Sequence, residues 1–366
     1  MPERTKMERK FNFNPGPATL PLEVLEELQK SVVDFNQAGM SVLEISHRSK
    51  EFLALLTETK SLFRELMEIP QDYEILFLGS GASLQFAMVP MNLLNPGERA
   101  DYIITGSWSK KAIKEAKFFG EAVVAATTED ENFRRVPKAE EIDLSQDAQY
   151  VHITSNNTIF GTQWKTFPKT NSIPLVADMS SDILSRKIDV GSFGLIYAGA
   201  QKNLGPAGVT VVIIRKYLAM GCPDSVPLML RYKTHIEENS LYNTPPVFAI
   251  YAVKLVLEWV KRNGGVEKIE EINNKKAELL YRAIDEASGF YRGTAEADSR
   301  SLMNVTFRLP DENLEQKFIQ EAAEIGLHGL KGHRSVGGIR ASIYNAFPVE
   351  GVECLVDFMQ RFSKAN

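Results

Sequence analysis

The stretch Tyr197-Ala-Gly-Ala-Gln-Lys202-Asn-Leu-Gly-Pro-Ala-Gly208 places one lysine among small and turn-forming residues, directly after an apolar run. Glycine and alanine leave little side-chain volume, so another molecule can approach the backbone closely. A poorly solvated lysine tends to lose its proton and can then act as a nucleophile. A lysine after a strand is more often a solvated surface residue, but surface lysines rarely have such small neighbours. Lys202 is therefore the first candidate for a catalytic residue.

A carboxylate occupies a similar position upstream. The stretch Ile173-Pro-Leu-Val-Ala-Asp178-Met-Ser-Ser181 is an apolar strand pattern that ends in Asp178. An aspartate after a strand is usually a helix cap or turn former. An amine and a carboxylate at neighbouring strand ends, however, suit the chemistry of pyridoxal phosphate (PLP). Lys202 would form the Schiff base, and Asp178 would keep the pyridine nitrogen protonated so that the ring acts as an electron sink.

Apolar strand patterns alternate with helical patterns over the first two thirds of the chain. The runs are apolar throughout, as expected of strands buried on both faces. We expect strands at 74–78, 102–104, 123–125, 150–153, 174–177, 194–197 and 210–214, with helices at 83–94 and 108–119. The alternation predicts an α/β fold with a mostly parallel, doubly wound sheet. A ligand of such a sheet binds at the carboxyl ends of the strands, where Asp178 and Lys202 fall.

The pattern changes near Asn263-Gly-Gly265. Helices are expected at 248–261, 267–286, 314–325 and after 349, with a strand at 302–307. We therefore predict a large cofactor-binding domain at 17–264 and a smaller α+β C-terminal domain at 265–366, on which the segment 11–16 packs. Residues 1–10 are charged and have no apolar core, so they are expected to be a disordered extension and not a secretory signal.

Composition excludes several classes of function. The net charge is −5 and no long basic block occurs, which argues against a nucleic-acid partner. No apolar run approaches the roughly 20 residues of a membrane span. The two cysteines, Cys222 and Cys354, form no CxxC pair and imply neither a disulfide framework nor a metal site. We interpret both as structural thiols in a reducing, cytoplasmic setting, with Cys354 on a helix that packs on a core.

Three further positions are candidates for cofactor contacts. The turn Gly79-Ser-Gly-Ala-Ser83 joins a strand to a helix and could present backbone N–H groups to an anion, although many such turns are only caps. Thr158 lies in a loop that follows a strand, where it could contact a cofactor or belong to an ordinary polar turn. Trp108 opens a helix at the same end of the sheet, where it could stack on a flat ring or be a core aromatic.

Histidine and arginine occur together in two places. His47 precedes Arg48, His333 precedes Arg334, and Arg340 follows shortly after the second pair. Arginine binds carboxylates and phosphates in a bidentate fashion, so three such arginines suit a substrate with two anionic ends. For any single arginine, the ordinary alternative is a surface ion pair.

Together with longer motifs, these residues resemble the phosphoserine aminotransferase family, which belongs to the class V aminotransferases of the fold type I PLP-dependent transferases. The resemblance runs from Phe11 to the C-terminal helix. Besides 197–208, its clearest motifs are Phe11-Asn-Phe-Asn-Pro-Gly-Pro-Ala18, Glu44-Ile-Ser-His-Arg-Ser-Lys-Glu-Phe52, Ile183-Leu-Ser-Arg-Lys-Ile-Asp-Val190, Tyr242-Asn-Thr-Pro-Pro246 and 331–348.

The resemblance implies a reaction and a set of site residues. The reaction is transamination between 3-phosphohydroxypyruvate and L-glutamate, giving O-phospho-L-serine and 2-oxoglutarate in serine biosynthesis, with a possible related step in pyridoxine biosynthesis. Lys202 and Asp178 would be the catalytic residues. The implied cofactor contacts are Ala82, Ser83, Trp108, Thr158, Asp178, Gln201, Lys202, Asn243 and Thr244. Asn243 and Thr244 would come from the other subunit of a homodimer.

The implied substrate contacts divide by function. Arg340 would bind the α-carboxylate, and His47, Arg48, His333 and Arg334 would receive the distal phosphate or the side-chain carboxylate of glutamate. The chain departs from the family pattern at one place, because some members carry Gly-Arg where this chain has Ala82 and Ser83. Ser83 can still donate to a phosphate, but one positive charge is absent.

Other classes of protein remain as alternatives. Another class V enzyme, such as an alanine–glyoxylate type aminotransferase, is the nearest. A cysteine desulfurase needs a nucleophilic cysteine on a mobile loop, and neither Cys222 nor Cys354 has a convincing one. A nucleotide-binding oxidoreductase would be expected to carry GxGxxG, which is absent here. A non-catalytic PLP-binding protein would keep the lysine but lack the substrate arginines.

Overall fold

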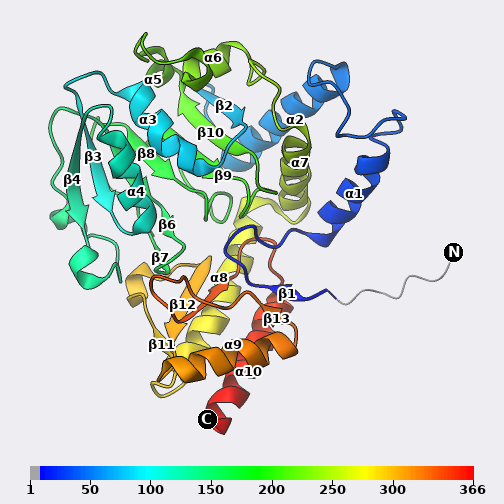
Figure 1. Cartoon of the computed structure of the whole chain (residues 1–366), viewed down its shortest axis with the longest axis vertical. Helices are drawn as coiled ribbons and strands as arrows, with labels where there is room; N and C mark the ends of the chain where they lie inside the picture. Colours follow the sequence, from blue (N-terminus) through cyan, green and yellow to red (C-terminus); the bar gives the residue numbers. More distant parts are fainter. Residues whose placement is uncertain (1–8) are drawn as a thin grey trace.

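A seven-stranded sheet with helices on both faces forms the upper part of the computed structural model, which describes residues 9–366 (Figure 1). The strand order is β2 (Tyr73–Leu78), β10 (Thr210–Arg215), β9 (Leu195–Gly199), β8 (Leu175–Asp178), β5 (Ala148–Thr154), β3 (Arg99–Ile104) and β4 (Glu121–Thr127). Only β10 runs antiparallel to its neighbours. The predicted, mostly parallel sheet is therefore confirmed, and all seven expected strands lie in it with ends shifted by a few residues.

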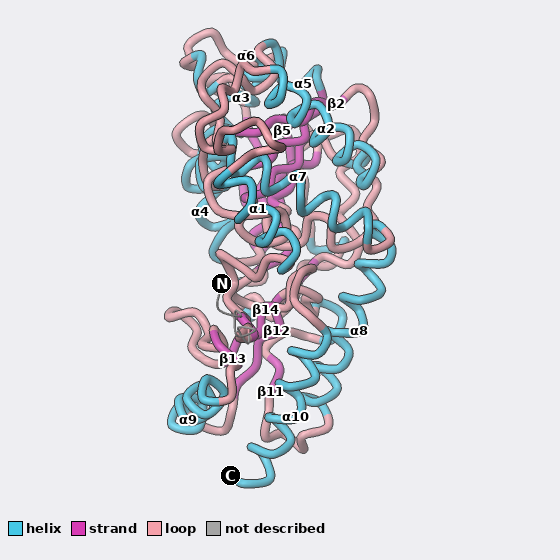
Figure 2. The backbone as a smooth tube through the Cα atoms, turned by 90° about the vertical axis from the view of Figure 1, so that its right-hand side faces the viewer, coloured by secondary structure: helices cyan, strands magenta, loops and turns pink. Residues whose placement is uncertain are grey.

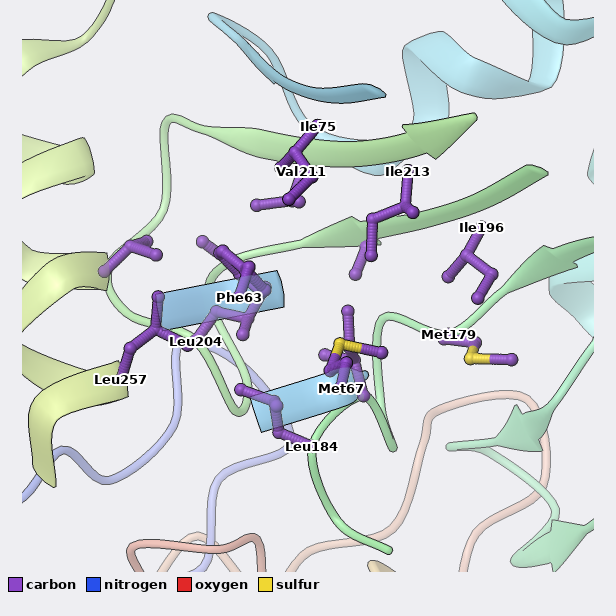
Figure 3. Close-up of a cluster of buried hydrophobic side chains, with 14 of the residues drawn as sticks. Phe63, Met67, Ile75, Met179, Leu184, Ile196, Leu204, Val211, Ile213 and Leu257 are labelled. Carbon is purple, nitrogen blue, oxygen red and sulfur yellow. The ribbon is translucent and has the colours of Figure 1, made fainter. Parts of the chain in front are cut away.

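The unbroken apolar runs are explained by burial on both faces. In β10, Val211 and Ile213 pack in one hydrophobic cluster, whereas Val212 and Ile214 pack in another on the opposite face. Successive strand side chains point to opposite faces, so a strand covered on both sides must be apolar at every position. Figure 3 shows part of the first cluster, with Val211 and Ile213 lying above Phe63.

Different helices cover the two faces. The first face is covered by α1 (Leu22–Val33), α2 (Lys50–Met67) and α7 (Val247–Arg262), and the second by α3 (Gln85–Leu93) and α4 (Ser107–Ala116). The sequence interpretation identified α3, α4 and α7 but missed α1 and α2. The signals for α2 were readable, because Ser49 caps its first turn by accepting a hydrogen bond from the Phe52 backbone N–H at 3.2 Å. Its buried residues also recur at helical spacing: Phe52, Leu55, Leu56, Thr59, Phe63 and Met67.

The C-terminal part of the chain forms a smaller α+β unit below the large sheet (Figure 2). Its three-stranded sheet has the order β11 (Arg292–Gly293), β12 (Asn304–Arg308) and β14 (Ile339–Ser342), and both pairings are antiparallel. The helices of this unit are α8 (Gly265–Asp285), α9 (Glu312–Glu324) and α10 (Val349–Ala365). They bury an aromatic cluster around Phe307, Phe318 and Phe362.

The N-terminal segment joins this smaller unit. Strand β1 (Phe11–Asn12) pairs in parallel with β13 (Leu327–His328), and Phe13 is fully buried in the C-terminal cluster. The chain then crosses to the large sheet, where the Ala18 backbone N–H donates to the Gln201 carbonyl at 2.9 Å. The domain limits 17–264 and 265–366 stay a prediction, and most of the expected 1–10 extension lies outside the described residues.

Neither cysteine of the chain is in a disulfide, and Cys354 is exposed on α10. The expected helix is present and packs on a core through Val352 and Leu355, but Cys354 lies on its exposed side and contributes no buried thiol to that core. Within residues 9–366, no helix is long and apolar enough to cross a membrane.

Candidate active site

A cavity of about 330 Å³ lies at the carboxyl ends of β5, β8 and β9. Its lining comes from both the large sheet and the C-terminal unit. The lining residues are Pro15, Gly16, Gly81, Ala82, Ser83, Phe86, Trp108, Thr154, Asn156, Thr158, Ile159, Asp178, Ser180, Ser181, Gln201, Lys202, His333 and Arg340. This volume falls within the range of small-molecule sites. The expected position of the ligand, at the strand ends next to Asp178 and Lys202, therefore coincides with a cavity.

Lys202 lies in the tight turn that follows β9. Its Nζ donates to Thr158 Oγ1 at 3.0 Å and to Ser181 Oγ at 2.7 Å. Burial lowers the pKa of the Lys202 amine to about 8, although the Asp178 carboxylate acts in the opposite direction. A Cβ at Gly199 would lie 2.6 Å from Gln201 Oε1, so a larger residue there would displace the Gln201 side chain. Lys202 is thus a positioned amine that deprotonates more easily than a surface lysine.

Asp178 ends β8 and is almost fully buried. Its Oδ1 accepts hydrogen bonds from the Ser180 backbone N–H at 2.9 Å and from Ser180 Oγ at 2.6 Å. No described residue donates a hydrogen bond to Oδ2. Burial raises the pKa of the Asp178 carboxyl, and the charge of Lys202 opposes that change. The carboxylate is therefore held in one orientation, with one oxygen available to a bound ligand.

Two segments from the second face of the sheet complete one side of the cavity. Ala82 and Ser83 lie in a short 3₁₀ turn (Ala82–Leu84) that leads into α3, so the regular helix expected from residue 83 begins only at Gln85. Trp108 is the second residue of α4, as its position after a strand predicted. The Trp108 Nε1 atom is buried without a hydrogen-bond partner among the described residues.

Arg340 reaches the cavity from the C-terminal unit. It lies on β14, only 6% of it is exposed, and its Nη1 donates to the Thr158 carbonyl at 3.4 Å. Its Nε has no partner among the described residues, and burial lowers the pKa of its guanidinium. His333 lines the same side, and its pKa is lowered by burial and by the nearby charges of Arg340 and Arg334. A buried guanidinium with an unsatisfied N–H group is suited to an anionic ligand.

The residues of the cavity fit PLP. The amine of Lys202 can bind an aldehyde, and Asp178 Oδ2 can accept a hydrogen bond from a protonated ring nitrogen. Thr154 Oγ1 and Trp108 Nε1 are buried polar atoms without partners, and both residues line the cavity. Buried polar groups are rarely left unpaired, so these atoms indicate a polar ligand in this place. Within the described range, no group of three or more histidine, cysteine or acidic side chains is arranged to hold a metal ion.

The structure brings together most, but not all, of the expected site residues. Ala82, Ser83, Trp108, Thr158, Asp178, Gln201, Lys202, His333 and Arg340 line one cavity. His47, Arg48, Asn243, Thr244 and Arg334 do not. Asn243 and Thr244 are exposed in the loop before α7, and His47 and Arg48 precede α2. Their assigned functions stay predictions.

Several lining residues were missed by sequence reasoning. Ser180 and Ser181 follow Asp178 directly, and a hydroxyl so close to a candidate carboxylate was a usable signal. Pro15 and Gly16 belong to a motif quoted above, but only the folded chain brings them to Lys202, where a Cβ at Gly16 would lie 3.4 Å from Lys202 Cγ. Thr154 and Asn156 carried no recognisable signal.

Comparison with known proteins identifies the class. The family model for class V aminotransferases matches residues 10–355. The chain belongs to the class V aminotransferase family, whose members use PLP. Within this family, it belongs with the phosphoserine aminotransferases.

The relatives match over their whole length. The chain is 58% identical to the phosphoserine aminotransferase of Bacillus subtilis over 98% of this chain and 100% of the relative, with the same figures for that of Halalkalibacterium halodurans. A solved phosphoserine aminotransferase from Bacillus circulans subsp. alkalophilus superimposes with a TM-score of 0.96 at 54% identity, covering 98% of this chain and 99% of the other. The PLP-bound phosphoserine aminotransferase from Trichomonas vaginalis superimposes with a TM-score of 0.92 at 38% identity, covering 96% of this chain and 100% of the other.

Proposed function

We propose that this chain is a phosphoserine transaminase that moves an amino group between O-phospho-L-serine and 2-oxoglutarate, giving 3-phosphohydroxypyruvate and L-glutamate, reversibly. The observation that carries the proposal is the shared cavity of Lys202, Asp178 and Arg340, which combines an amine, a buried carboxylate and an unsatisfied guanidinium. The identity to phosphoserine aminotransferases along the whole chain supports the choice of substrates. A cytoplasmic place in serine biosynthesis, and a related step in pyridoxine biosynthesis, belong to the same proposal.

Lys202 and Asp178 have separate acid–base functions. When bound, PLP withdraws electrons from the amino acid and so makes its α-proton acidic. The Lys202 amine, with a pKa near 8, can accept that proton at one carbon and return it at another near neutral pH. Thr158 and Ser181 hold Nζ in position through their hydroxyls. The Asp178 carboxylate would accept a hydrogen bond from the ring nitrogen of bound PLP and so would hold a proton on that nitrogen.

Arginine side chains account for recognition of the two anionic ends. Arg340 is buried next to Thr158 and has an unpaired Nε–H, which supports a contact with the α-carboxylate of every amino acid substrate. The phosphate of phosphoserine, or the distal carboxylate of glutamate, would then extend toward His333 and Arg334. His333 lines the cavity, and Arg334 lies close enough to lower the pKa of its ring.

The assignment of Arg334 predicts a loss that depends on the substrate. Arg334→Ala should lower kcat/KM for phosphoserine and glutamate by about 10- to 100-fold, because a charge-assisted contact is worth about 1.5–3 kcal/mol. Single-turnover rates with alanine, which has no distal anion, should change less than about twofold. Arg361→Ala, an exposed arginine on α10, provides the control. Equal losses for alanine and phosphoserine would show that Arg334 does not recognise the distal group.

We further propose a homodimer in which each active site is shared. The Asn243 and Thr244 side chains lie outside the cavity of their own chain and are exposed at the start of α7. Their family-implied contact with the phosphate of PLP would therefore be made in the neighbouring subunit. Leu43 precedes the His47-Arg48 pair in the sequence, and Tyr242 directly precedes Asn243. Both apolar side chains are exposed, which is consistent with a protein contact.

Subunit complementation tests the shared site. One chain would carry Lys202→Ala and the other Asn243→Leu with Thr244→Val, each inactive as a homodimer. In the mixed dimer, one site has an intact lysine and an intact loop, so up to half of the wild-type activity per dimer should return. Purified mixed dimers that stay inactive would contradict the shared site. Each parent homodimer is the control for exchange of subunits.

A further inference from the structure

A second cavity, of about 560 Å³, lies against the active site and is lined by four arginines. It is formed by the strands of the small sheet, the 332–337 loop and two segments of the large unit. The arginines of its lining are Arg134, Arg292, Arg308 and Arg340. Ile159 and Arg340 also line the first cavity, so they form the partition between the two.

The charge of this second cavity is not balanced. Among the residues that the structure describes, no aspartate or glutamate belongs to its lining. The ion pairs found within residues 9–366 include none for Arg134, Arg292 or Arg340. Arg308 alone is paired, through Nε with Glu315 at 2.5 Å. A concave surface lined by one sign of charge concentrates ions of the opposite sign.

The guanidiniums also keep N–H groups available for a ligand. Arg308 donates Nη1 to the Val336 carbonyl at 2.9 Å, and Arg292 donates Nη2 to the Leu309 carbonyl at 3.2 Å. These bonds to backbone oxygens fix each side chain without neutralising its charge. Arg340 also lines this cavity and adds its positive charge there, whereas its buried Nε–H is assigned to the ligand of the first cavity. Fixed guanidiniums with free N–H groups are well suited to bind carboxylates and phosphates.

We propose that this cavity is a second anion site, which binds a small dianion beside the reacting cavity. Its ligand is a phosphate monoester or a short dicarboxylate. The two anionic substrates belong to these classes, and this part of the inference rests on the proposed function. Only Ile159 and Arg340 separate a dianion bound there from the cofactor cavity, and Arg340 lines both cavities. The site raises the local concentration of anionic substrate and so increases kcat/KM without changing kcat.

The test is a double variant, Arg134→Gln with Arg292→Gln, in the holoenzyme. The matched control is Arg361→Gln with Lys364→Gln, which removes the same charge from exposed positions of α10 that do not line the cavity. Calorimetric titration at low ionic strength would use inorganic phosphate in one arm and succinate in the other. The wild type and the control should bind one more anion per chain than the double variant does. If the double variant still binds this anion, its affinity should be at least about tenfold lower. The arm with the larger difference identifies the class of ligand.

Steady-state kinetics of the double variant provide an independent test of the second anion site. The double variant should show a three- to tenfold lower kcat/KM for phosphoserine at low salt, an unchanged kcat, and a difference that fades as salt is added. Single-turnover rates with alanine should be unaffected. Identical titrations for the double variant and the control would overturn the proposal, whereas wild-type enzyme that binds phosphate but does not turn over phosphoserine would contradict the proposed function alone.

Discussion

Replacing Lys202 with alanine should abolish transamination and lower kcat by at least about 10⁴-fold, because it removes both the covalent anchor and the acid–base group. The side chain lies in the cavity with Nζ fixed by two hydroxyls, and no other lysine of residues 9–366 lines that cavity. The variant should fold, since alanine fits among the small residues of this turn. Steady-state assay with phosphoserine and 2-oxoglutarate gives the rate, and circular dichroism verifies the fold.

The matched control is Lys165→Ala. The Lys165 amine also has a pKa of about 8, lowered by desolvation and by the nearby Arg186, but it does not line the active-site cavity. This variant should retain full activity. Borohydride reduction of the wild-type holoenzyme, followed by peptide mapping, should place the cofactor on Lys202. Retention of more than a few per cent of activity in Lys202→Ala, or a labelled peptide that lacks Lys202, would exclude this assignment.

Replacing Asp178 with asparagine should lower kcat by about 10²- to 10³-fold, which is the range expected when a proton can no longer be held at a reacting group. Asparagine keeps an oxygen that accepts from Ser180, so the local hydrogen bonds can persist. The lost feature is the negative charge at the atom that faces the cavity. Binding of PLP should weaken less than kcat falls, because Lys202 still anchors the aldehyde.

Asp101→Asn is the control for loss of a buried aspartate. Asp101 lies on β3, is fully buried, and accepts hydrogen bonds from the Ser145 backbone and hydroxyl at 2.7 and 2.8 Å. It does not line the cavity, so its replacement should lower stability by about 1–3 kcal/mol and leave kcat unchanged. If both aspartate variants lost stability alone and kept kcat, Asp178 would be a structural residue.

The large sheet could be predicted from the sequence because its strands are continuous apolar runs. Strand β10 is covered on both faces, and its four inner residues, 211–214, are all apolar. Helix α2 was also predictable from the sequence, because Ser49 is a typical N-cap residue and the apolar residues from Phe52 to Phe63 recur at helical spacing. Both signals were overlooked. The two-residue strands β1 and β13 were not accessible in this way, because their pairing joins residues more than three hundred positions apart. No local pattern encodes such a contact.

The site residues also differ in whether the local sequence or only the folded chain reveals them. Lys202 and Asp178 were recognisable because Asp178 ends a strand, Lys202 follows one, and both have small or polar neighbours in the sequence. Arg340 was identified by its residue type and by family resemblance, yet only the folded chain shows that its Nε–H is buried and unsatisfied. The arginine-lined second cavity was not predictable, because Arg134, Arg292 and Arg308 come from separate segments and each resembles a surface arginine in the sequence. Assembly of distant side chains is a property of tertiary packing.

Transfer of labelled nitrogen tests the central claim most directly. Purified holoenzyme would be incubated with phosphoserine that carries ¹⁵N in its amino group, together with unlabelled 2-oxoglutarate, and the products would be followed by mass spectrometry. The proposed function predicts that ¹⁵N appears in glutamate, in amounts equal to the 3-phosphohydroxypyruvate formed, and that Lys202→Ala stops both. Release of ¹⁵N as ammonia, or the absence of labelled glutamate from active holoenzyme, would contradict the account.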